Sequence, residues 1–568
     1  MKKMLLIAAL GLMSLTAGAV PVKPGVWRTL TLADGTTVRA EARGSEHGSW
    51  WEDQQGQCYI LQYGEYVKIE RETLKGYFEQ AHQTRRANGG RRVLGTATDD
   101  GLGTLDRNSW GAMPSNGEWD IPVLMVEFTD AKFKPEHTTQ LIQDYLTKEG
   151  FTYSKNSNSR GSIRDFFVAQ SRGKFKPNFK LLGKVTVNKP YTYYGADDPN
   201  NPALTDLNCE ELPGDAMRAA KEQLQGVDFT QFSKPAPDTW HKAGIPLICL
   251  LYPGLPQSAN PEKTDLIWPH QLDLNKTEGI DIEGVGVHLN SYFVGNELAE
   301  RTKYDETTEE ITTEEQLEGI GVFCHELGHA LGLPDWYCTN DSYKEDDAFG
   351  HWSTMDNGCY NGQTWVPVGY TAYERSYLGW LTIGEYDQKD DLKLTNPQGD
   401  NAALLIYNPS DKKEYFILET RQPSTWYPNY QGTGLLLTRY AFDEDDWLYD
   451  RPNNVQNKKR GLVITADKTK LNYSSNNANL FGNGVNEIKN LQFWSGKALE
   501  VSITNIQKND DGSVTFLYDP GTTAISEALK VKSEKWADAA WYDLQGRKLC
   551  GEPSDKGIYI FKGKKVKK

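Results

Sequence analysis

The pattern of apolar and polar residues first predicts a small β-rich unit near the amino end of the chain. Apolar and polar positions alternate around residues 27–39, a turn falls at Asp34-Gly35, and an apolar run covers 58–69. Alternation with a period of two is typical of half-buried strands. From about residue 80 to 119 the chain is rich in Gly, Arg, Asn, Asp and Thr, which predicts an exposed linker.

Two dibasic pairs lie in this linker, at 85–86 and 91–92. An exposed dibasic pair is a place where a trypsin-like protease could cut the chain. The same composition also fits a charged loop with no part in processing. The sequence leaves both interpretations open for residues 20–118, the unit and its linker.

A longer region of mixed pattern follows and predicts an α/β or α+β domain over residues 119–385. Apolar runs at 121–128 and 245–252 predict buried strands. Ser162 and Asp165 have the spacing of a helix capping box, and the residues behind them form an apolar stripe. Strands mixed with helices over this length indicate a domain with a layered sheet.

Beyond residue 385 the pattern changes to short strands separated by turns. The pattern of residues 386–520 therefore predicts a β-rich, sandwich-like accessory domain. The expected strands are 402–407, 414–419, 434–440, 461–465 and 512–518. A last segment, 521–568, contains a pair of short apolar runs at 540–544 and 557–561 and is too small for a good core of its own.

One long apolar run stands at the amino end. Lys2 and Lys3 precede the apolar residues 4–15, and the small residues Ala-Gly-Ala follow at 17–19. This order is typical of a secretory signal peptide covering residues 1–19. A membrane anchor is the alternative, but the run is shorter than the ~20 residues that span a bilayer. We expect a secreted or cell-surface protein with no stable membrane span.

Composition narrows the classes of partner. The 568 residues carry 62 Lys and Arg against 77 Asp and Glu, a formal net charge of −15. Since phosphate backbones attract basic surfaces, nucleic acid is a poor candidate partner. Seven Cys residues are too few for a disulfide scaffold in a chain of this length, and their odd number leaves at least one without an internal partner.

The chemistry concentrates in one stretch that reads H-E-x-x-H-x-x-G-x-x-D. His325 and His329 stand four residues apart, so on a helix their imidazoles leave the same face and can bind one metal ion. A capping box at Thr312 and Glu315 is expected to begin this helix. Its apolar stripe is expected to consist of Leu317, Ile320, Cys324, Leu327 and Leu331.

The residues around the two histidines complete a candidate zinc site. Glu326 is placed beside the metal as a general base. Gly332 can take a positive φ just past the helix, so that the chain turns and returns Asp335 as the third ligand. Two His and one carboxylate leave a fourth zinc position open. His351 or a more distant Glu is the alternative third ligand.

These residues resemble the metzincin-type zinc metalloproteases of the immune inhibitor A-like family, whose motif matches His325, Glu326, His329, Gly332 and Asp335. The resemblance implies a multidomain protein with a metzincin-like α/β (α+β) catalytic domain, a β-rich pro-region and a β-sandwich-like C-terminal region.

Other segments carry further implications of the resemblance. Met355, in the run Trp-Ser-Thr-Met-Asp-Asn-Gly, is similar to the Met-turn beneath the zinc ligands, and Tyr360 is a candidate oxyanion stabiliser. The segment 32–36 is similar to pro-regions of exported proteins, which implies a zymogen. Residues 541–547 and 557–560 resemble a shortened sorting domain of the type IX secretion kind, which implies a partner in the secretion machinery; a terminal hairpin module is the alternative.

Calcium and cysteine chemistry remain secondary expectations. Relatives often carry an Asp/Gly-rich run suited to Ca²⁺, and this chain departs from it at 232–238. The acidic run at 443–446 could hold Ca²⁺ instead, although a solvated loop is the more ordinary interpretation. Cys58 could cap zinc as a thiolate in the pro-region. Cys338 and Cys359 flank the Met-turn and could form a disulfide.

The sequence therefore predicts a secreted zinc endopeptidase, made as a zymogen, that acts on protein or peptide substrates. In this hypothesis Glu326 takes a proton from the attacking water and passes it to the leaving amine. One alternative is a surface adhesin or glycan-binding protein that keeps a protease-like fold. Another is a zinc hydrolase that cleaves non-peptide amides such as cell-wall cross-links.

Overall fold

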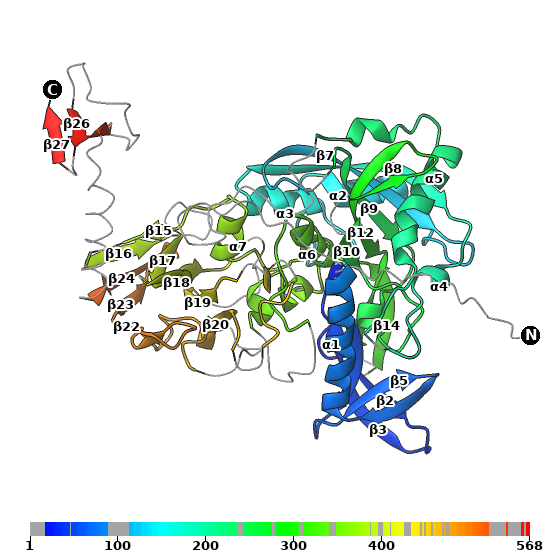
Figure 1. Cartoon of the computed structure of the whole chain (residues 1–568), viewed down its shortest axis with the longest axis horizontal. Coiled ribbons are helices and arrows are strands. Elements are labelled where there is room, and N and C mark those ends of the chain that lie inside the picture. Colours follow the sequence, from blue (N-terminus) through cyan, green and yellow to red (C-terminus); the bar gives the residue numbers. More distant parts are fainter. Residues whose placement is uncertain are drawn as a thin grey trace, which may run out of the picture.

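The computed structural model describes most of the chain in three parts (Figure 1). Described are residues 17–88 without 46, and 113–521 without 202, 236–241, 275–278, 306–309, 340–347 and several shorter stretches between 387 and 476. Three short strands beyond residue 540 complete the description. The apolar run at 4–15 and the dibasic pair at 91–92 lie outside these residues.

A seven-stranded mixed sheet forms the centre of the molecule, in the order β1-β10-β12-β9-β7-β8 with β11 beside β12. Its parallel part consists of β7 Gly117–Glu127, β8 Phe175–Thr186, β9 Ile245–Tyr252 and β12 Val287–Asn296. Antiparallel to β12 run β10 His270–Asp273 and β11 Ile280–Ile282, and β1 Ala17–Ala19 runs antiparallel to β10 at the edge. The strands expected at 121–128 and 245–252 are confirmed.

Helices cover both faces of this sheet because its strands are apolar on both sides. One face packs against α2 Thr139–Thr147, α3 Ile163–Gln170 and α6 Gly321–Ala330, and the other packs against α4 Tyr191–Tyr194 and α5 Leu212–Gln223. Along β9, Leu247 and Cys249 belong to the first core while Ile248 and Leu250 belong to the second. The capping box predicted at the start of α3 is present, with Asp165 N donating to Ser162 Oγ at 3.2 Å.

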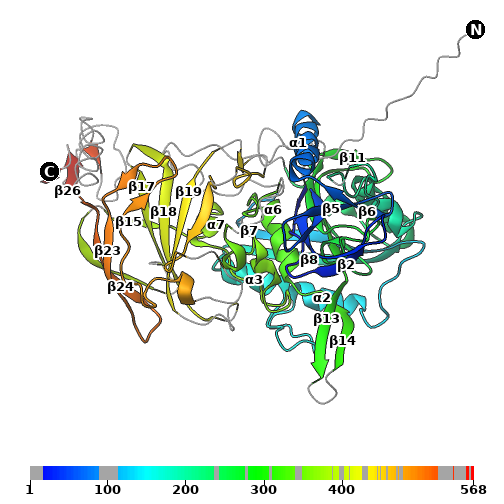
Figure 2. The same ribbon diagram turned by 90° about the horizontal axis from the view of Figure 1, so that it is seen from below.

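The start expected for the ligand helix is wrong. Residues expected to cap it belong instead to β14 Glu310–Leu317, which pairs antiparallel with β13 Leu298–Asp305 in a hairpin that projects from the molecule (Figure 2). Thr312 pairs with Lys303 and Glu315 with Glu300 in this ladder. Ladder pairing outweighs the local capping signal, and α6 begins only at Gly321.

The amino-terminal region is β-rich, as predicted. Its five-stranded sheet consists of β2 Trp27–Thr31, β3 Thr37–Ser45, β4 Gly48–Asp53, β5 Cys58–Gln62 and β6 Glu65–Ile69. The linker expected from residue 80 begins as a helix, because α1 Arg71–Asn88 contains the pair at 85–86. Leu74 and Phe78, one helical turn apart, are buried beside Trp50 and Ile60 of the sheet and hold α1 there.

The carboxy-terminal region has the strands that the sequence predicted. A five-stranded sheet contains β15 Gly384–Glu385, β17 Ala403–Asn408, β18 Asp411–Arg421, β19 Gly434–Ala441 and β20 Gly461–Ile464. A three-stranded sheet contains β16 Asp390–Leu394, β23 Ser502–Lys508 and β24 Val514–Asp519. One apolar core joins residues of both sheets, which makes this part a sandwich.

Smaller elements complete the description. β21 Leu491–Gln492 pairs with β22 Ala498–Leu499, α7 Ala372–Tyr377 precedes β15, and β25 Trp541–Tyr542, β26 Ile558–Phe561 and β27 Lys564–Lys567 form a separate sheet. This last sheet contains the strand pair expected there. Among the residues that the structure describes, none of the helices has the length and apolarity needed to cross a membrane.

Candidate metal centre and active site

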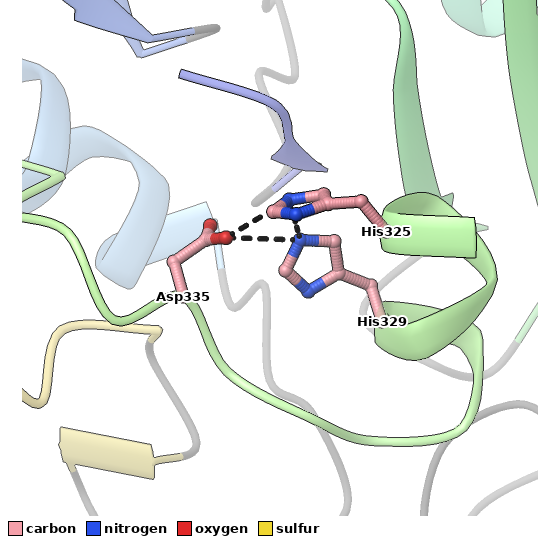
Figure 3. Close-up of side chains that lie close together, drawn as sticks. All are labelled: His325, His329 and Asp335. Atoms are coloured by element: carbon pink, nitrogen blue, oxygen red, sulfur yellow. Dashed lines mark hydrogen bonds and ion pairs between the residues drawn. The ribbon is translucent and has the colours of Figure 1, made fainter. Parts of the chain in front are cut away.

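Two histidines of α6 point from one face of the helix toward a common centre (Figure 3). The whole helix is buried, and His325 and His329 are among its buried residues. Their Nε2 atoms lie 3.0 Å apart. The i, i+4 spacing read from the sequence therefore brings the two imidazoles together as predicted.

The backbone fixes how each ring is protonated. His325 Nδ1 lies 2.7 Å from the carbonyl oxygen of Thr354, and His329 Nδ1 lies 2.9 Å from that of Leu333. A carbonyl oxygen only accepts, so each Nδ1 carries the proton and donates it. The Nε2 atom of each neutral ring is then left as a lone-pair donor toward the shared centre, which is the usual arrangement of metal-binding histidines.

Asp335 closes the centre as its third corner. Gly332 has a φ of 99° just after α6, a left-handed conformation that glycine adopts without strain. The chain turns there, and Asp335 Oδ1 lies 3.1 Å from both Nε2 atoms. Among the described residues, this is the one cluster of three or more potential ligands (His, Cys, Asp or Glu) whose ligand atoms lie close enough to hold a metal ion.

The three donors fit a divalent metal ion of zinc size. Both carboxylate oxygens of Asp335 are buried and accept no hydrogen bond from the part of the chain that the structure describes. Burying a carboxylate and two imidazole lone pairs in this way is unfavourable without a cation. Donors of one tetrahedral zinc ion stand about 3.3 Å apart, given zinc–ligand bonds of about 2.0–2.1 Å. The observed separations of 3.0 to 3.1 Å are close to this value.

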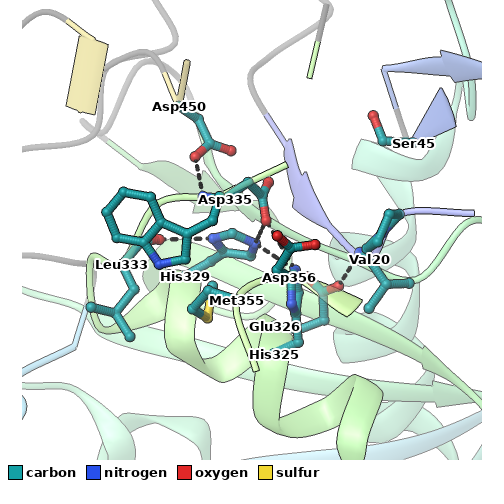
Figure 4. A network of polar contacts seen from close by, with 12 residues as sticks. Val20, Ser45, His325, Glu326, His329, Leu333, Asp335, Met355, Asp356 and Asp450 are labelled. Carbon is teal, nitrogen blue, oxygen red and sulfur yellow. Dashed lines mark hydrogen bonds and ion pairs between the residues drawn. The ribbon is translucent and has the colours of Figure 1, made fainter. Parts of the chain in front are cut away.

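Glu326 lies beside the three donors and is fully buried (Figure 4). Its Oε1 atom accepts a hydrogen bond of 3.0 Å from the backbone nitrogen of Val20. A backbone nitrogen thus lies within proton-transfer reach of this carboxylate. The geometry suits the general-base position expected from the sequence.

Met355 lies under the ligand helix. Gly328, between the two histidines, has no side chain, and a Cβ built there would come 2.5 Å from Met355 Sδ. The Met355 side chain therefore packs directly against the helix backbone. The residue before it, Thr354, supplies the carbonyl that holds His325, and Met355 O accepts from Trp336 N at 3.0 Å.

Sequence reasoning missed two buried acids that support the site. Glu374 accepts from Trp336 Nε1 at 2.7 Å and from Ser353 Oγ at 2.5 Å, so it ties the ligand loop to the segment of Met355. Burial raises the pKa of Glu374. Asp450 Oδ1 accepts from Asp335 N at 2.7 Å. The Thr371-x-x-Glu374 capping box could have indicated α7, but no local signal points to Asp450.

The alternatives from the sequence take other places. His351 is buried against Trp352 and is not part of the donor group. Tyr360 OH donates to Pro21 O at 2.6 Å. Cys58 is buried beside Trp50, Ile60 and Leu74 in the amino-terminal unit rather than at the metal centre.

One further expectation is corrected, and another stays a prediction. Cys359 is not disulfide-bonded, so the bridge to Cys338 is not formed; Cys359 packs instead against Val20 and Val322. In the acidic run at 443–446, Asp446 pairs with Arg451 and Arg460, and Asp443 pairs with Arg460. These two carboxylates are thus paired with arginine within the chain, and calcium stays a prediction.

Two histidines four residues apart, a glutamate between them and an aspartate after a glycine turn form an arrangement typical of metal-dependent hydrolases. The comparisons with known proteins give the same class. Residues 120–385 match the family model described as immune inhibitor A peptidase M6, catalytic domain. The chain therefore contains a peptidase M6 catalytic domain.

Two curated relatives extend the similarity beyond this domain. The chain is 20% identical over 448 residues to the pre-pro-metalloprotease PrtV of Vibrio cholerae serotype O1, covering 75% of this chain and 44% of the relative. It is 24% identical over 487 residues to immune inhibitor A of Bacillus thuringiensis subsp. alesti, covering 79% of this chain and 61% of the relative. The chain thus spans about half the length of these homologous proteins.

Proposed function

We propose that this chain is a secreted zinc-dependent endopeptidase, made as a zymogen, that hydrolyses peptide bonds of extracellular proteins. The observation that carries the proposal is the buried triangle of His325 Nε2, His329 Nε2 and Asp335 Oδ1, with sides of 3.0 and 3.1 Å. Two nitrogens and one carboxylate leave a fourth position, as in catalytic zinc sites. One of the two relatives is named a metalloprotease, which supports the same class of activity.

Zinc, when bound, would supply Lewis acidity to the scissile carbonyl and to the attacking water. The chain's own residues would do the rest. Glu326 would take the proton of the water and return it to the leaving nitrogen. The 3.0 Å contact between Glu326 Oε1 and the Val20 nitrogen supports the second step, because it shows that a backbone nitrogen can reach this carboxylate.

The edge of the central sheet suits an extended peptide. Strand β1 lies antiparallel along β10, with Ala19 paired to His270, immediately before the residue that contacts Glu326. Backbone pairing of this kind binds a peptide largely without regard to its side chains. This supports protein and peptide substrates over a cell-wall amide.

Burial of most aromatic side chains in the carboxy-terminal region argues against the glycan-binding alternative. Aromatic residues of the carboxy-terminal region that suggested it are largely in the core, where Tyr415, Trp426, Tyr440 and Trp447 are buried. Exposed aromatic side chains are what a glycan site would require. The peptidase proposal therefore stands alone.

The domain layout is part of the proposal. It consists of a signal peptide (1–19), a pro-region with its linker (20–118), the catalytic domain (119–385), a β-rich region (386–520) and a terminal segment (521–568) that contacts the secretion machinery. The metzincin-like arrangement, with Met355 as the floor of the zinc site, belongs to it as well. Deletion of 521–568 should abolish export without changing zinc content if the terminal segment is a sorting signal.

The decisive experiment compares three chains: the chain that begins at Val20, the same chain cut by limited proteolysis near residue 92, and the cut Glu326→Gln variant. Each is measured for zinc content and casein hydrolysis. We expect about one zinc per chain in all three, and hydrolysis in the cut wild-type chain alone. Zinc without hydrolysis in the cut wild-type chain, indistinguishable from Glu326→Gln, would overturn the proposal.

A further inference from the structure

The segment that follows β1 enters the active site and lies against its general base (Figure 4). Val20 is fully buried and packs with Val322 of α6 and with Cys359. Val322 belongs to the same helix as the two metal-binding histidines. A side chain of the amino-terminal region thus fills space beside the candidate metal centre.

Polar contacts hold this segment in one register. Val20 N donates to Glu326 Oε1 at 3.0 Å, and Val20 O accepts from Trp268 Nε1 at 2.9 Å. Pro21 O accepts from Tyr360 OH at 2.6 Å. Two residues later, Lys23 N donates to Ser258 O at 2.9 Å. Three of these four consecutive residues therefore make polar contacts with the catalytic domain, while Pro21 has no N–H that needs a partner.

Removal of residues 1–19 changes the chemistry of the first contact. The Val20 nitrogen would then be a primary amine, protonated as an ammonium group, instead of a peptide amide. A buried ammonium needs an anionic partner, and Glu326 is the carboxylate 3.0 Å away. A charge-assisted hydrogen bond of this kind is roughly twice as strong as a neutral one.

The position of this nitrogen has a meaning for the reaction. After hydrolysis of a peptide bond, the new amino end of the product lies where the general acid has just delivered its proton. Val20 N occupies that position relative to Glu326. The carboxylate that must take a proton from water is then engaged by a cation.

We propose that the active site contains a binding site for a free peptide amino end, and that the processed amino end Val20-Pro-Val-Lys23 occupies it as a product-like inhibitor. The proposal rests on the proposed peptidase function and on removal of residues 1–19. Its ligand class is an α-ammonium group followed by a short extended peptide. Latency would then begin with signal-peptide removal and end when the amino-terminal region is cut away.

The first test measures binding. A chain that consists of residues 24–568 is mixed with the peptide amide Val-Pro-Val-Lys. The amino group of the peptide is either free or acetylated, and binding is followed by calorimetry. Because one charge-assisted hydrogen bond distinguishes the two peptides, we expect the free amine to bind about tenfold more tightly. The Glu326→Gln variant of the same chain should lose most of this preference. Equal binding of the two peptides, or failure of both to bind, would overturn the proposal.

The second test uses the intact amino end. Two full chains, one beginning at Val20 and one beginning with a single Gly before Val20, are treated with an amine-reactive reagent, and α-amine labelling is quantified by mass spectrometry. We expect labelling at least about tenfold slower for the Val20 chain, because its amine is paired with Glu326. Equal rates would contradict the proposal even if the protein folds and binds zinc.

These readouts separate the inference from the function on which it rests. Casein hydrolysis by the cut protein together with equal peptide binding would leave the peptidase standing and remove the amino-end site. Preferential binding of the free amine without casein hydrolysis would support the amino-end site and remove the peptidase function.

Discussion

The amino-terminal and carboxy-terminal regions both adjoin the catalytic domain, yet they are attached in different ways. The amino-terminal unit has two small cores of its own, and of their buried residues only Trp268 and Ala203 come from the catalytic domain. The carboxy-terminal region shares the largest core of the molecule. Its buried contributions to that core are Ala402, Ala403, Leu405, Tyr415, Ile417, Trp426, Leu436, Tyr440, Phe442, Trp447, Val463 and Leu480.

The contacts at the ligand loop show the same difference. Tyr440 of β19 stacks on Tyr373 with ring centroids 4.2 Å apart, and it also meets Trp336, the neighbour of the ligand Asp335. The amino-terminal segment reaches the site mainly through a few hydrogen bonds to Val20, Pro21 and Lys23. The first attachment is a continuous apolar core and the second is a docked chain end. The carboxy-terminal region is therefore held by a continuous core, whereas the amino-terminal segment is held by a few contacts from which it can be released.

The largest expected effect comes from breaking the shared core. Tyr440→Ala removes a buried ring and leaves a cavity, which should lower the free energy of unfolding by about 3–5 kcal/mol. The measurement is thermal unfolding of the whole chain by calorimetry. Tyr59→Ala, in the core of the amino-terminal unit, is the matched control and should spare the main transition. An equal loss in both variants would show that the two regions are attached alike.

The next effect concerns metal affinity and Asp450, the carboxy-terminal residue that accepts a hydrogen bond from the backbone of the ligand Asp335. Asp450→Gly removes the acceptor of Asp335 N without adding strain at the φ of 54°. Because this contact orients a ligand, we expect zinc affinity to fall about 10- to 100-fold in a chelator competition. Asp450→Asn keeps an oxygen acceptor and tolerates positive φ, so it should restore most of the affinity. Equal affinity in Asp450→Gly and wild type would contradict this role.

A smaller effect is expected at the docked chain end. Trp268→Phe removes the donor to Val20 O and should weaken docking by about 1 kcal/mol, or about fivefold. Labelling of the Val20 amine should become faster by that factor, with little change in the main unfolding transition. Trp50→Phe is the control, since the indole N–H of Trp50 is buried with no hydrogen-bond partner in the part of the chain described. Equal labelling of both variants would argue against the Trp268 contact.

Local patterns in the sequence were enough for much of this picture. The period of α6 and the glycine after it predicted the positions of His325, His329 and Asp335, because each depends on residues within one or two turns. Apolar runs predicted β7, β9 and the strands of the sandwich for the same reason. The capping box at 312–315 misled because the pairing of β14 with β13 depends on a strand elsewhere in the chain.

The attachments of the two flanking regions had no local signal. Asp450 lies 115 residues along the chain from Asp335, whose amide donates a hydrogen bond to it, and Val20 lies 306 residues from Glu326. Such contacts follow from the tertiary fold and leave no periodicity or motif in either segment. The boundary placed at residue 385 follows the change in the hydrophobic pattern of the sequence. Residues on both sides of this boundary nevertheless belong to one apolar core.

The smallest expected effect is a pH dependence on the amino-terminal side. Burial lowers the pKa of His270 to about 4. This residue lies on β10 opposite Ala19. Its Nδ1 is 2.7 Å from Trp268 O and its Nε2 is 2.8 Å from Tyr292 OH, with the carboxylate of Asp206 nearby. The unfolded chain binds a proton at His270 near the ordinary pKa of about 6.5, whereas the folded chain does not until about pH 4. Stability from this residue is therefore complete above pH 6.5 and falls as the pH drops toward 4, by about 1 kcal/mol between pH 7.5 and 5.5. Thermal unfolding at these two pH values should show a smaller acid loss in His270→Gln than in wild type. An identical loss in both would place the acid sensitivity elsewhere in the molecule.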